Sequence, residues 1–538
     1  MSEVVVSQPT APEAGRVVAR VAVPGLAASS VLAVGSLGAG WMAPASGMGA
    51  HPLIDAVRSS EVGASLAKLL VVVAAGALVR IWVRARPLAR GLGVVQAQQL
   101  GAVGLVWSVP LLVAPVLFSR DVFSYIALSR LPSAGIDPYQ HGTGVLSTSW
   151  SDGADPMWFD APAPYGPVWI LASSALFRLT DAEPTAALLG FRLLALAGVG
   201  LLAVFVPRLA VRAGADPGTA AWLAVLNPMV LFHFGVAAHN DALMVGLLIA
   251  GLALALGGRV GIGVAVVTLA GLVKAPALLA LPFLAVYLAT STPGWRIRIR
   301  VGTTVLSVAL AVAAATTVAA GVGVGWVANL ATPTEVDTWL SPSTALGRTI
   351  GLVAEAGELA SADSVLHVAR LAGLVVAALM LGWLLLTARR RPLLRTIALA
   401  LLAVVVLGPV VHPWYLLWPL PLLAVSVTSR RELGWIVGAS LGLATYTVAN
   451  TAATSAALFS VGDGVAVLAA AVVALSIALG PRLGGRRGVR GPATGREADV
   501  AEPTRDRLSS TSRAGTSTGR PAWPAPTPRA DPATEPAP

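Results

Sequence analysis

A long series of apolar segments constrains the fold of this sequence more than any other feature. A helix that crosses a bilayer needs about 20 apolar residues, with a range of about 17–25. Segments near this length lie at 21–43, 66–84, 98–118, 187–206, 219–237, 240–257, 259–273, 276–290, 301–321, 366–387, 396–411, 414–428, 433–450 and 461–480. The sequence therefore predicts an all-α polytopic membrane protein with about 13–15 transmembrane helices.

The charge content agrees with a membrane protein. Of the 538 residues, 56% are hydrophobic and 12% are charged, whereas soluble proteins have about 25% charged residues. A net charge of +11 would suggest nucleic acid as a partner in a soluble chain. Here the basic residues cluster between apolar segments, so the expected partner is the lipid bilayer and not nucleic acid. The absence of cysteine excludes disulfide bonds and thiol chemistry.

Arginine clusters follow every second apolar segment. They lie at Arg80 to Arg90, Arg208 and Arg212, Arg259, Arg296 to Arg300, Arg389 to Arg395, and Arg430 and Arg431. Because cytoplasmic loops are enriched in basic residues, these loops are predicted to be cytoplasmic. The other loops, of which 119–167 and 322–365 are the largest, are then extracytoplasmic, and they hold most of the unusual polar residues.

The remaining boundaries follow from length and composition. Residues 1–20 are predicted to be a cytoplasmic N-terminus, because the apolar stretch after them is too long for a signal-peptide core. Segment 168–179 has only about 12 residues, and its crossing would reverse the arginine pattern, so it is predicted to lie along the outer interface. A multispan domain occupies 21–480, and residues 481–538 are predicted to form a disordered cytoplasmic tail.

The 119–167 loop is the longest polar interruption and is rich in aspartate and aromatic residues. Arg120 and Asp121 follow an apolar segment directly, so they either form an ion pair at the interface or take part in chemistry. A carboxylate at this edge of the bilayer can act as a general base on an acceptor hydroxyl. We therefore take Asp121 as the candidate base and Arg120 as a candidate substrate-binding residue.

Aromatic and acidic residues further along this loop are additional substrate-binding candidates. They are Tyr125, Asp137, Tyr139 and Tyr165. Aromatic faces in the proline-rich part of the loop can stack on sugar rings, but they can equally anchor a loop at the membrane interface.

His239, Asn240 and Asp241 form a polar turn between two apolar segments. They can cap the following helix, or they can hydrogen-bond to a sugar or a pyrophosphate-type group. Metal binding has weak support, because no second histidine or carboxylate lies nearby at ligand spacing. We predict no cofactor and no metal site, and a divalent cation stays open.

Lys274 and Arg348 are the candidate phosphate-binding residues. A charge within a helix at membrane depth costs about 2.5–3.5 kcal/mol on insertion scales, and Pro276 predicts a helix break beside Lys274. A cation at such a break suits a lipid phosphate, whereas snorkelling to the interface is the alternative. Arg348 is one of few arginines in the predicted outer loops, and its guanidinium suits bidentate phosphate binding.

His412, Trp414 and Tyr415 lie at another predicted outer helix end. They form either an aromatic belt at the interface or part of a substrate groove. The chain has no Gly-rich phosphate loop of the P-loop type and no large cytoplasmic domain for a nucleotide sugar. Any glycosyl donor is therefore expected to be lipid-linked and to be used on the outer face.

Several stretches of sequence together carry a family resemblance: SRDVFSYIALSRL, GIDPYQHG, DPMWFDAPAPYGPVW, NPMVLFHFGVAAHNDALMVGLL, LVKAPALLALP and HPWYLLWPL. They closely resemble the actinobacterial polyprenol-phosphate-mannose-dependent α-(1→6)-mannosyltransferases. These are multispan glycosyltransferases of the GT-C fold that build lipomannan and lipoarabinomannan. The resemblance extends from about residue 98 to 428.

The resemblance implies a reaction and roles for some residues. The donor would be polyprenyl-phospho-β-mannose and the acceptor a mannosylated lipid or glycan, with inversion to an α-mannoside on the outer face of the plasma membrane. Asp121 matches the family position of the base, and Lys274 and Arg348 would hold the phosphate leaving group. A GT-C transferase for another lipid-linked sugar and a transporter or flippase of a lipid-linked sugar are the alternatives. The polar residues gather on one predicted face, which favours an enzyme over a transporter.

Overall fold

The computed structural model describes residues 11–42, 47–146, 153–181, 183–290, 294–335 and 338–454. These residues form helices, turns and loops without a β-sheet, and Trp41 and Val116 form an isolated backbone bridge. The predicted all-α fold class is confirmed. The predicted span 461–480 and the predicted tail 481–538 lie outside the described residues.

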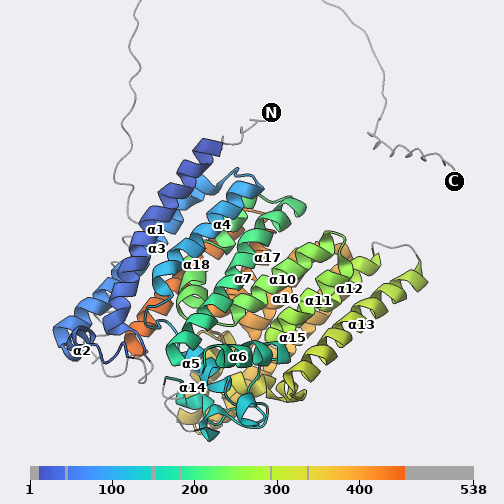
Figure 1. The fold of residues 1–538 in the computed structure, drawn as a ribbon. Coiled ribbons are helices and arrows are strands. Elements are labelled where there is room, and N and C mark those ends of the chain that lie inside the picture. Colours follow the sequence, from blue (N-terminus) through green and yellow to red (C-terminus); the bar gives the residue numbers. More distant parts are fainter. Residues whose placement is uncertain are drawn as a thin grey trace, which may run out of the picture. The chain divides into compact units, whose positions relative to one another are not determined.

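Five helices of the described part are long and apolar enough to cross a bilayer on their own. They are α1 (Ala11–Ala39), α3 (Glu61–Ala89), α7 (Pro184–Arg212), α13 (Trp295–Ala320) and α15 (Ala362–Thr387). Each coincides with a predicted transmembrane segment, so the chain is a polytopic membrane protein. Figure 1 shows α1 and α3 side by side, with α7 and α13 running in broadly the same direction.

Shorter helices account for other predicted segments. They are α4 (Val94–Ser108), α10 (Asp241–Leu256), α11 (Val260–Val273), α12 (Ala280–Thr290) and α16 (Leu393–Leu407). The 16 residues of α10 extend about 24 Å at 1.5 Å per residue, which is less than the hydrocarbon core of about 30 Å. Polar residues at the ends of such helices can therefore lie at the depth of the bilayer.

Five further helices lie outside the predicted spans or toward the end of the described chain. They are α2 (Pro52–Ser59), α5 (Asp121–Leu128), α6 (Pro167–Leu179), α14 (Pro342–Ala356) and α18 (Arg430–Thr454), with short turns of 3₁₀-helix between several elements.

Two predicted spans are not continuous helices. The segment 219–237 consists of α8 (Pro217–Ala224), α9 (Pro228–Val230) and a π-helix η5 (Leu231–Val236), with a bend of 42° at the break. The break lies at Asn227-Pro228, because proline cannot donate the helical hydrogen bond. The Asn227 side chain instead accepts from the backbone N–H of Met229 and starts a new helix.

The segment 414–428 is likewise broken. It contains the 3₁₀-helix η9 (Pro413–Leu417) and the short helix α17 (Leu420–Ala424). The prolines at the starts of these elements explain both the breaks and the short lengths. The segment is therefore not one continuous helix, and the irregular backbone leaves polar side chains free to turn toward a common site.

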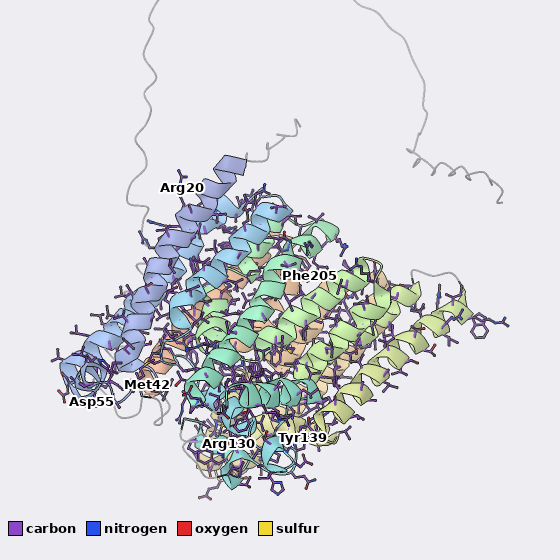
Figure 2. All side chains as sticks on the ribbon, in the orientation of Figure 1. Arg20, Met42, Asp55, Arg130, Tyr139 and Phe205 are labelled. Carbon is purple, nitrogen blue, oxygen red and sulfur yellow. The ribbon has the colours of Figure 1, made fainter. Side chains whose placement is uncertain are left out.

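Helix α6 is the segment that the sequence placed along the outer interface. Figure 1 shows α6 lying across the ends of the neighbouring helices and not parallel to α7; its place at the membrane interface stays a prediction. Figure 2 shows Arg20 toward one end of α1, with Met42 beyond the other end and Arg130 and Tyr139 of the 119–167 loop also toward that other end. The assignment of these ends to the two faces of the membrane stays a prediction.

Glycines let α7 and α10 approach closely. A Cβ atom at Gly198 would lie 2.2 Å from the carbonyl oxygen of Ala242, and one at Gly246 would lie 2.4 Å from the carbonyl oxygen of Gly198. Small residues at a helix crossing allow backbones to pack directly against each other in membrane proteins. This contact fixes the first turn of α10, which begins at Asp241.

We expect Gly198→Val to lower the thermal unfolding temperature of the purified protein. The added side chain has no space, and overpacking costs about 1–3 kcal/mol or more. Gly200→Val is the matched control, because Gly200 lies on the same helix and a Cβ atom there would have no described heavy atom of a neighbouring segment within 4 Å. Equal unfolding temperatures for the two variants in detergent would contradict the close contact.

Candidate active site

Five segments bring polar and aromatic side chains together. They are the start of α5, the residues just before α6, the turn between η5 and α10, the end of α11, and η9 with the residue before it. Ten of the predicted site residues contact one another in this region. They are Asp121, Tyr125, Tyr165, His239, Asn240, Asp241, Lys274, His412, Trp414 and Tyr415. We refer to this set as the polar cluster.

Asp121 and His239 form the pair at one side of the polar cluster. The Asp121 Oδ2 atom lies 3.2 Å from the His239 Nδ1 atom, and the aspartate side chain is 23% exposed while the histidine is fully buried. Burial acts to raise the pKa of the Asp121 carboxyl, but the hydrogen bond with His239 and the nearby His412 and Lys274 lower this pKa to about 2. The carboxylate is therefore ionised at neutral pH and reachable by a ligand.

Asp241 and Lys274 form a second pair. The lysine Nζ atom lies 2.9 Å from both carboxylate oxygens of Asp241, which is fully buried, whereas the lysine side chain is 16% exposed. The Trp418 indole N–H also donates to Asp241. The Asn240 side chain at the start of α10 makes no capping hydrogen bond, so the alternative that Asn240 caps this helix is wrong.

Stacked rings connect the two pairs. The His239 and His412 rings lie on the Trp414 ring, with centroid distances of 4.0 and 4.3 Å and interplanar angles of 22° and 6°. Tyr415 stacks on Trp418 at 4.1 Å, and the Lys274 ammonium lies 5.5 and 5.6 Å from these two ring centroids. A lysine over aromatic faces gains cation–π attraction, so the stack holds the cation near the aspartates.

The polar cluster contains buried polar atoms that no described protein group satisfies. The Tyr125 hydroxyl donates to Asn240 Oδ1 at 3.4 Å, but the Asn240 Nδ2, His239 Nε2 and Trp414 Nε1 atoms have no hydrogen-bond partner within the described part of the chain. Buried polar groups are nearly always satisfied by protein or by bound molecules. These atoms therefore offer hydrogen bonds to a polar ligand such as a sugar.

Strained backbone flanks both members of the first pair. Phe118 and Ala238 adopt positive φ angles of 72° and 54°, three residues before Asp121 and one residue before His239. Left-handed backbone at non-glycine residues costs about 1–3 kcal/mol and is concentrated at functional sites. The π-helix η5 ends at the same place, where the His239 N–H donates to the His233 carbonyl at 3.0 Å.

Three residues in or beside the polar cluster are missing from the prediction. Trp418 binds Asp241, and the His233 ring lies 5.6 Å from His239 while its Nε2 atom lies 3.1 Å from Thr447 Oγ1. Arg192 is fully buried on α7. Its guanidinium donates to the Leu112 and Ala114 carbonyls, in the segment that leads to Asp121, and to the Val236 carbonyl, in the segment that leads to His239.

A signal for each missed residue exists in the sequence. Trp418 follows Trp414 at i+4 within the same proline-rich segment, and His233 precedes His239 by six residues. Arg192 interrupts an apolar span, and ionisable residues inside spans mark functional positions.

Four predicted residues lie outside the polar cluster. Arg120 donates to the Gly153 and Ala154 carbonyls at 2.9 and 2.7 Å, so it holds the loop instead of pairing with Asp121. Asp137 accepts from the Tyr139 backbone N–H within its own turn.

Tyr139 is buried against the segment that follows α13, where its carbonyl accepts from Asn329. Arg348 lies on α14, and its guanidinium repels that of Arg370. Substrate roles for these residues and for Arg120 and Asp137 stay predictions.

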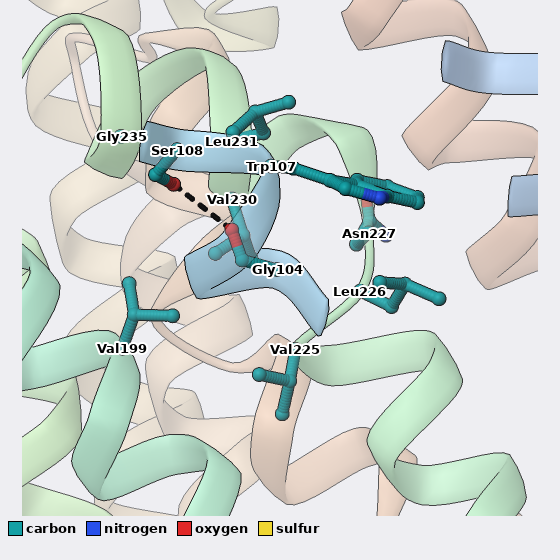
Figure 3. Close-up of a pocket in the computed structure, with 10 residues that line it drawn as sticks. All are labelled: Gly104, Trp107, Ser108, Val199, Val225, Leu226, Asn227, Val230, Leu231 and Gly235. Atoms are coloured by element: carbon teal, nitrogen blue, oxygen red, sulfur yellow. Dashed lines mark hydrogen bonds between the residues drawn. The ribbon is translucent and has the colours of Figure 1, made fainter. Parts of the chain in front are cut away.

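Two further features complete the description of the site region. A small cavity of about 10 Å³ lies where the span containing α8 and η5 is broken, lined by residues such as Ser108 and Asn227; Figure 3 shows Ser108 hydrogen-bonded to the Gly104 carbonyl there. That volume holds about one water molecule, so this cavity is too small for a sugar. Among the described residues, no three His, Asp or Glu side chains converge as metal ligands.

Comparisons with known proteins match most of the chain. A sequence profile described as "Alpha-(1->6)-mannopyranosyltransferase, N-terminal domain" matches residues 22–290, and one described as "MptB C-terminal domain" matches residues 343–479. The chain is 33% identical over 430 residues to alpha-(1->6)-mannopyranosyltransferase A of Mycobacterium tuberculosis, covering 77% of this chain and 82% of that protein. No solved structure matches the chain.

A second relative gives the same family. The chain is 26% identical over 429 residues to alpha-(1->6)-mannopyranosyltransferase B of Corynebacterium glutamicum, covering 73% of this chain and 71% of that protein. The residues matched by the first profile include Asp121, His239 and Lys274, and those matched by the second include Trp414. The matches thus favour the enzyme over the transporter alternative, and the two profiles include the whole polar cluster. The chain belongs to the α-(1→6)-mannopyranosyltransferase family and is a multi-pass membrane mannosyltransferase.

Proposed function

We propose that this enzyme transfers mannose from polyprenyl-phospho-β-mannose to O6 of a mannosylated lipid or glycan, with inversion, on the outer face of the plasma membrane. The product would extend the backbone of a mannan lipid such as lipomannan or lipoarabinomannan. The observation that carries the proposal is a partly exposed carboxylate, Asp121, paired with buried His239 beside the Lys274–Asp241 pair. A base and a cation in one place suit a hydroxyl acceptor and a phosphate leaving group.

The reaction is a single displacement in which Asp121 acts as the base. The acceptor hydroxyl oxygen forms a bond to C1 of the donor mannose while the bond from C1 to the phosphate oxygen breaks. The hydroxyl proton passes to Asp121, and the electron pair of the broken bond leaves with polyprenyl phosphate. Attack opposite the leaving group converts the β-linked donor into an α-linked product.

The choice between the two aspartates of the polar cluster follows from exposure and pairing. Asp241 is fully buried and is held by both Lys274 and Trp418, so it has no free approach for a hydroxyl. Asp121 is 23% exposed, and its close partner is His239. A general base must come within hydrogen-bond reach of the proton that it accepts, and the exposure of Asp121 favours it over Asp241 for this role.

Lys274 is the proposed phosphate ligand. Polyprenyl phosphate gains negative charge as it leaves, so a preorganised cation stabilises the transition state. The Lys274 side chain is partly exposed, and an ammonium group has a third N–H in addition to the two that the Asp241 oxygens can accept. Arg348, on α14, stays a second candidate in the proposal.

The aromatic part of the polar cluster is proposed to bind the sugars. Trp414 Nε1 and Asn240 Nδ2 are buried donors without partners in the described chain, and sugar hydroxyls are suitable acceptors. A lipid-linked donor also suits the fold, because it can reach a site between membrane helices without a nucleotide-binding domain.

The direct test is transfer by the purified protein in lipid nanodiscs. We expect radiolabelled mannose to pass from polyprenyl-phosphomannose to an α-mannoside acceptor, and linkage analysis to find an α-(1→6) bond. Polyprenyl-phosphoglucose and a polyprenyl-phosphopentose serve as competing donors. Faster transfer from either of these, or a β-linked product, would contradict the proposal.

We expect His239→Phe to shift the acid limb of the pH–rate profile to higher pH. The contact with His239 lowers the pKa of the Asp121 carboxyl, and without it the effect of burial, which raises this pKa, is opposed only by the smaller effects of His412 and Lys274. Because Asp121 accepts a proton only when ionised, a raised pKa means that activity is lost at a higher pH. The measurement is kcat/KM between about pH 4 and pH 8.

His239→Asn is the conservative comparison for that experiment. Its side-chain N–H can still donate to Asp121, so we expect a smaller shift than in His239→Phe. A profile for His239→Phe that coincides with the wild-type profile would remove His239 as the residue that positions and ionises the base.

A further inference from the structure

An apolar groove lies beside the segment that carries Asp121. It encloses about 160 Å³, which is similar to an engineered apolar cavity of about 150 Å³ that binds benzene. Residues from four regions line it: Trp41 and Met48 after α1, Val113 before α5, Phe123 on α5, and Leu189 on α7. Val113 is 68% exposed, so the groove opens to the surroundings of the protein on that side.

The chain that follows α1 is attached to the catalytic segment. Trp41 and Val116 exchange backbone hydrogen bonds of 2.8 and 3.0 Å, and the Arg120 guanidinium lies 6.0 Å from the Trp41 ring centroid. A Cβ atom at Gly40 would lie 2.7 Å from Pro115 Cβ, so the two segments are in direct contact. The residues that follow α1 therefore form one wall of a groove whose other wall contains α5, the helix that begins at Asp121.

The charges at the groove do not suit a phosphate. Glu183 is the one ionisable residue among the lining residues described, and its carboxylate accepts from the backbone N–H groups of Thr185 and Ala186. No lysine or arginine lines the groove within the described chain, and Lys274 is not among its residues. An uncharged hydrocarbon chain is therefore favoured there over an anionic phosphate.

We propose that this groove holds the hydrocarbon chain of the mannosyl acceptor. The hydrocarbon chain would lie between the residues that follow α1 and the start of α7, and the acceptor sugar would extend past Phe123 toward Asp121. The groove thus gives the helix pair α1 and α3 a role, because the segment between them supplies Trp41 and Met48. This inference rests on the proposed function, in which Asp121 activates an acceptor hydroxyl.

The first test compares two acceptors that carry the same sugar and differ in the length of their alkyl chain. The rate measured is transfer to octyl α-mannoside, below its micellar concentration, relative to methyl α-mannoside. We expect Leu189→Trp, which fills the groove, to lower the ratio of the two kcat/KM values by about tenfold, with the KM for polyprenyl-phosphomannose unchanged. Val113→Trp, at the exposed rim, is a second variant that leaves the packed interior intact.

The control is Leu193→Trp. Leu193 lies one turn further along α7, is 52% exposed and does not line the groove. Membrane partitioning of the octyl chain is the same in every variant, so a change in the ratio reports the groove itself. An unchanged ratio in both groove variants would overturn the proposal. A raised donor KM in those variants would also overturn it, because the groove would then hold the donor chain.

A second test needs no donor and so separates this inference from the proposed function. An alkyl α-mannoside with a diazirine at the end of its chain is photo-crosslinked to the protein in nanodiscs, and labelled peptides are mapped by mass spectrometry. We expect labelling of the peptides that contain Met48, Val113 or Leu189, with a loss of labelling in Leu189→Trp and in competition with octyl α-mannoside. Labelling confined to other peptides would overturn the groove assignment even if mannosyl transfer is observed. Groove labelling without any transfer from polyprenyl-phosphomannose would contradict the proposed donor alone.

Discussion

Asp121→Asn is expected to abolish mannosyl transfer while the protein still folds. The asparagine side chain has nearly the same shape, and its carbonyl oxygen can still accept from His239, whose ring lies 3.2 Å from the aspartate. An amide cannot take the acceptor proton, and general base catalysis contributes about 10²–10⁴-fold in rate. The measurement is kcat for transfer from polyprenyl-phosphomannose in nanodiscs, together with the thermal unfolding temperature.

Asp160→Asn is the matched control for this variant. Asp160 lies in the same 119–167 loop but is exposed and is not part of the polar cluster. We expect its rate to stay close to that of the wild type. Normal turnover in Asp121→Asn would exclude this carboxylate as the base, and equal losses in both variants would indicate a general effect of charge in the loop.

Lys274→Met is expected to lose both stability and transfer. It leaves the fully buried Asp241 carboxylate without its cation, and breaking a buried ion pair by removing one partner costs about 3–5 kcal/mol. The loss of activity in this variant alone therefore cannot be assigned to phosphate binding. The measurement needs a companion variant in which the buried charge is also removed.

The double variant Lys274→Met with Asp241→Asn separates the two effects. Replacing both partners removes the unpaired charge, and the asparagine oxygen can still accept from the Trp418 indole. We expect the unfolding temperature to recover most of its loss, because a buried ion pair adds little net stability over neutral groups. We expect transfer to stay impaired, since the cation that stabilises the leaving phosphate is absent.

Recovery of transfer in the double variant would show that Lys274 serves only to pair with Asp241. A double variant that stays as unstable as Lys274→Met would show that the pair itself holds the fold. Arg348→Gln is a useful addition, because a large rise in donor KM there would transfer the phosphate role to α14.

Several features of the site could be predicted from local sequence. The position of Asp121 just after an apolar segment marked it as a candidate, and the proline-rich context of His412 and Trp414 marked a broken helix end. Lys274 could be identified because placing a lysine among apolar residues of a membrane span costs free energy. Each of these signals depends only on a residue and its immediate neighbours along the chain.

Other features depend on contacts between distant segments. Lys274 and Asp241 are 33 positions apart, and Trp418 and Asp241 are 177 positions apart, so no local pattern reveals that the phosphate candidate already has a counter-ion. The positive φ angles at Phe118 and Ala238 carry no composition signal either. Phenylalanine and alanine disfavour positive φ angles, so the packing of the surrounding segments must impose this backbone conformation.

The amino-acid sequence is enough to predict a helical membrane protein and the loops that carry its polar residues. Both follow from the cost of placing apolar surface in water and charge in lipid, which each segment incurs on its own. Which of the two aspartates is accessible depends on how the helices pack in the folded protein. It buries Asp241 against Lys274 and leaves Asp121 partly exposed beside His239, because burial and pairing arise when helices that are distant in sequence pack together.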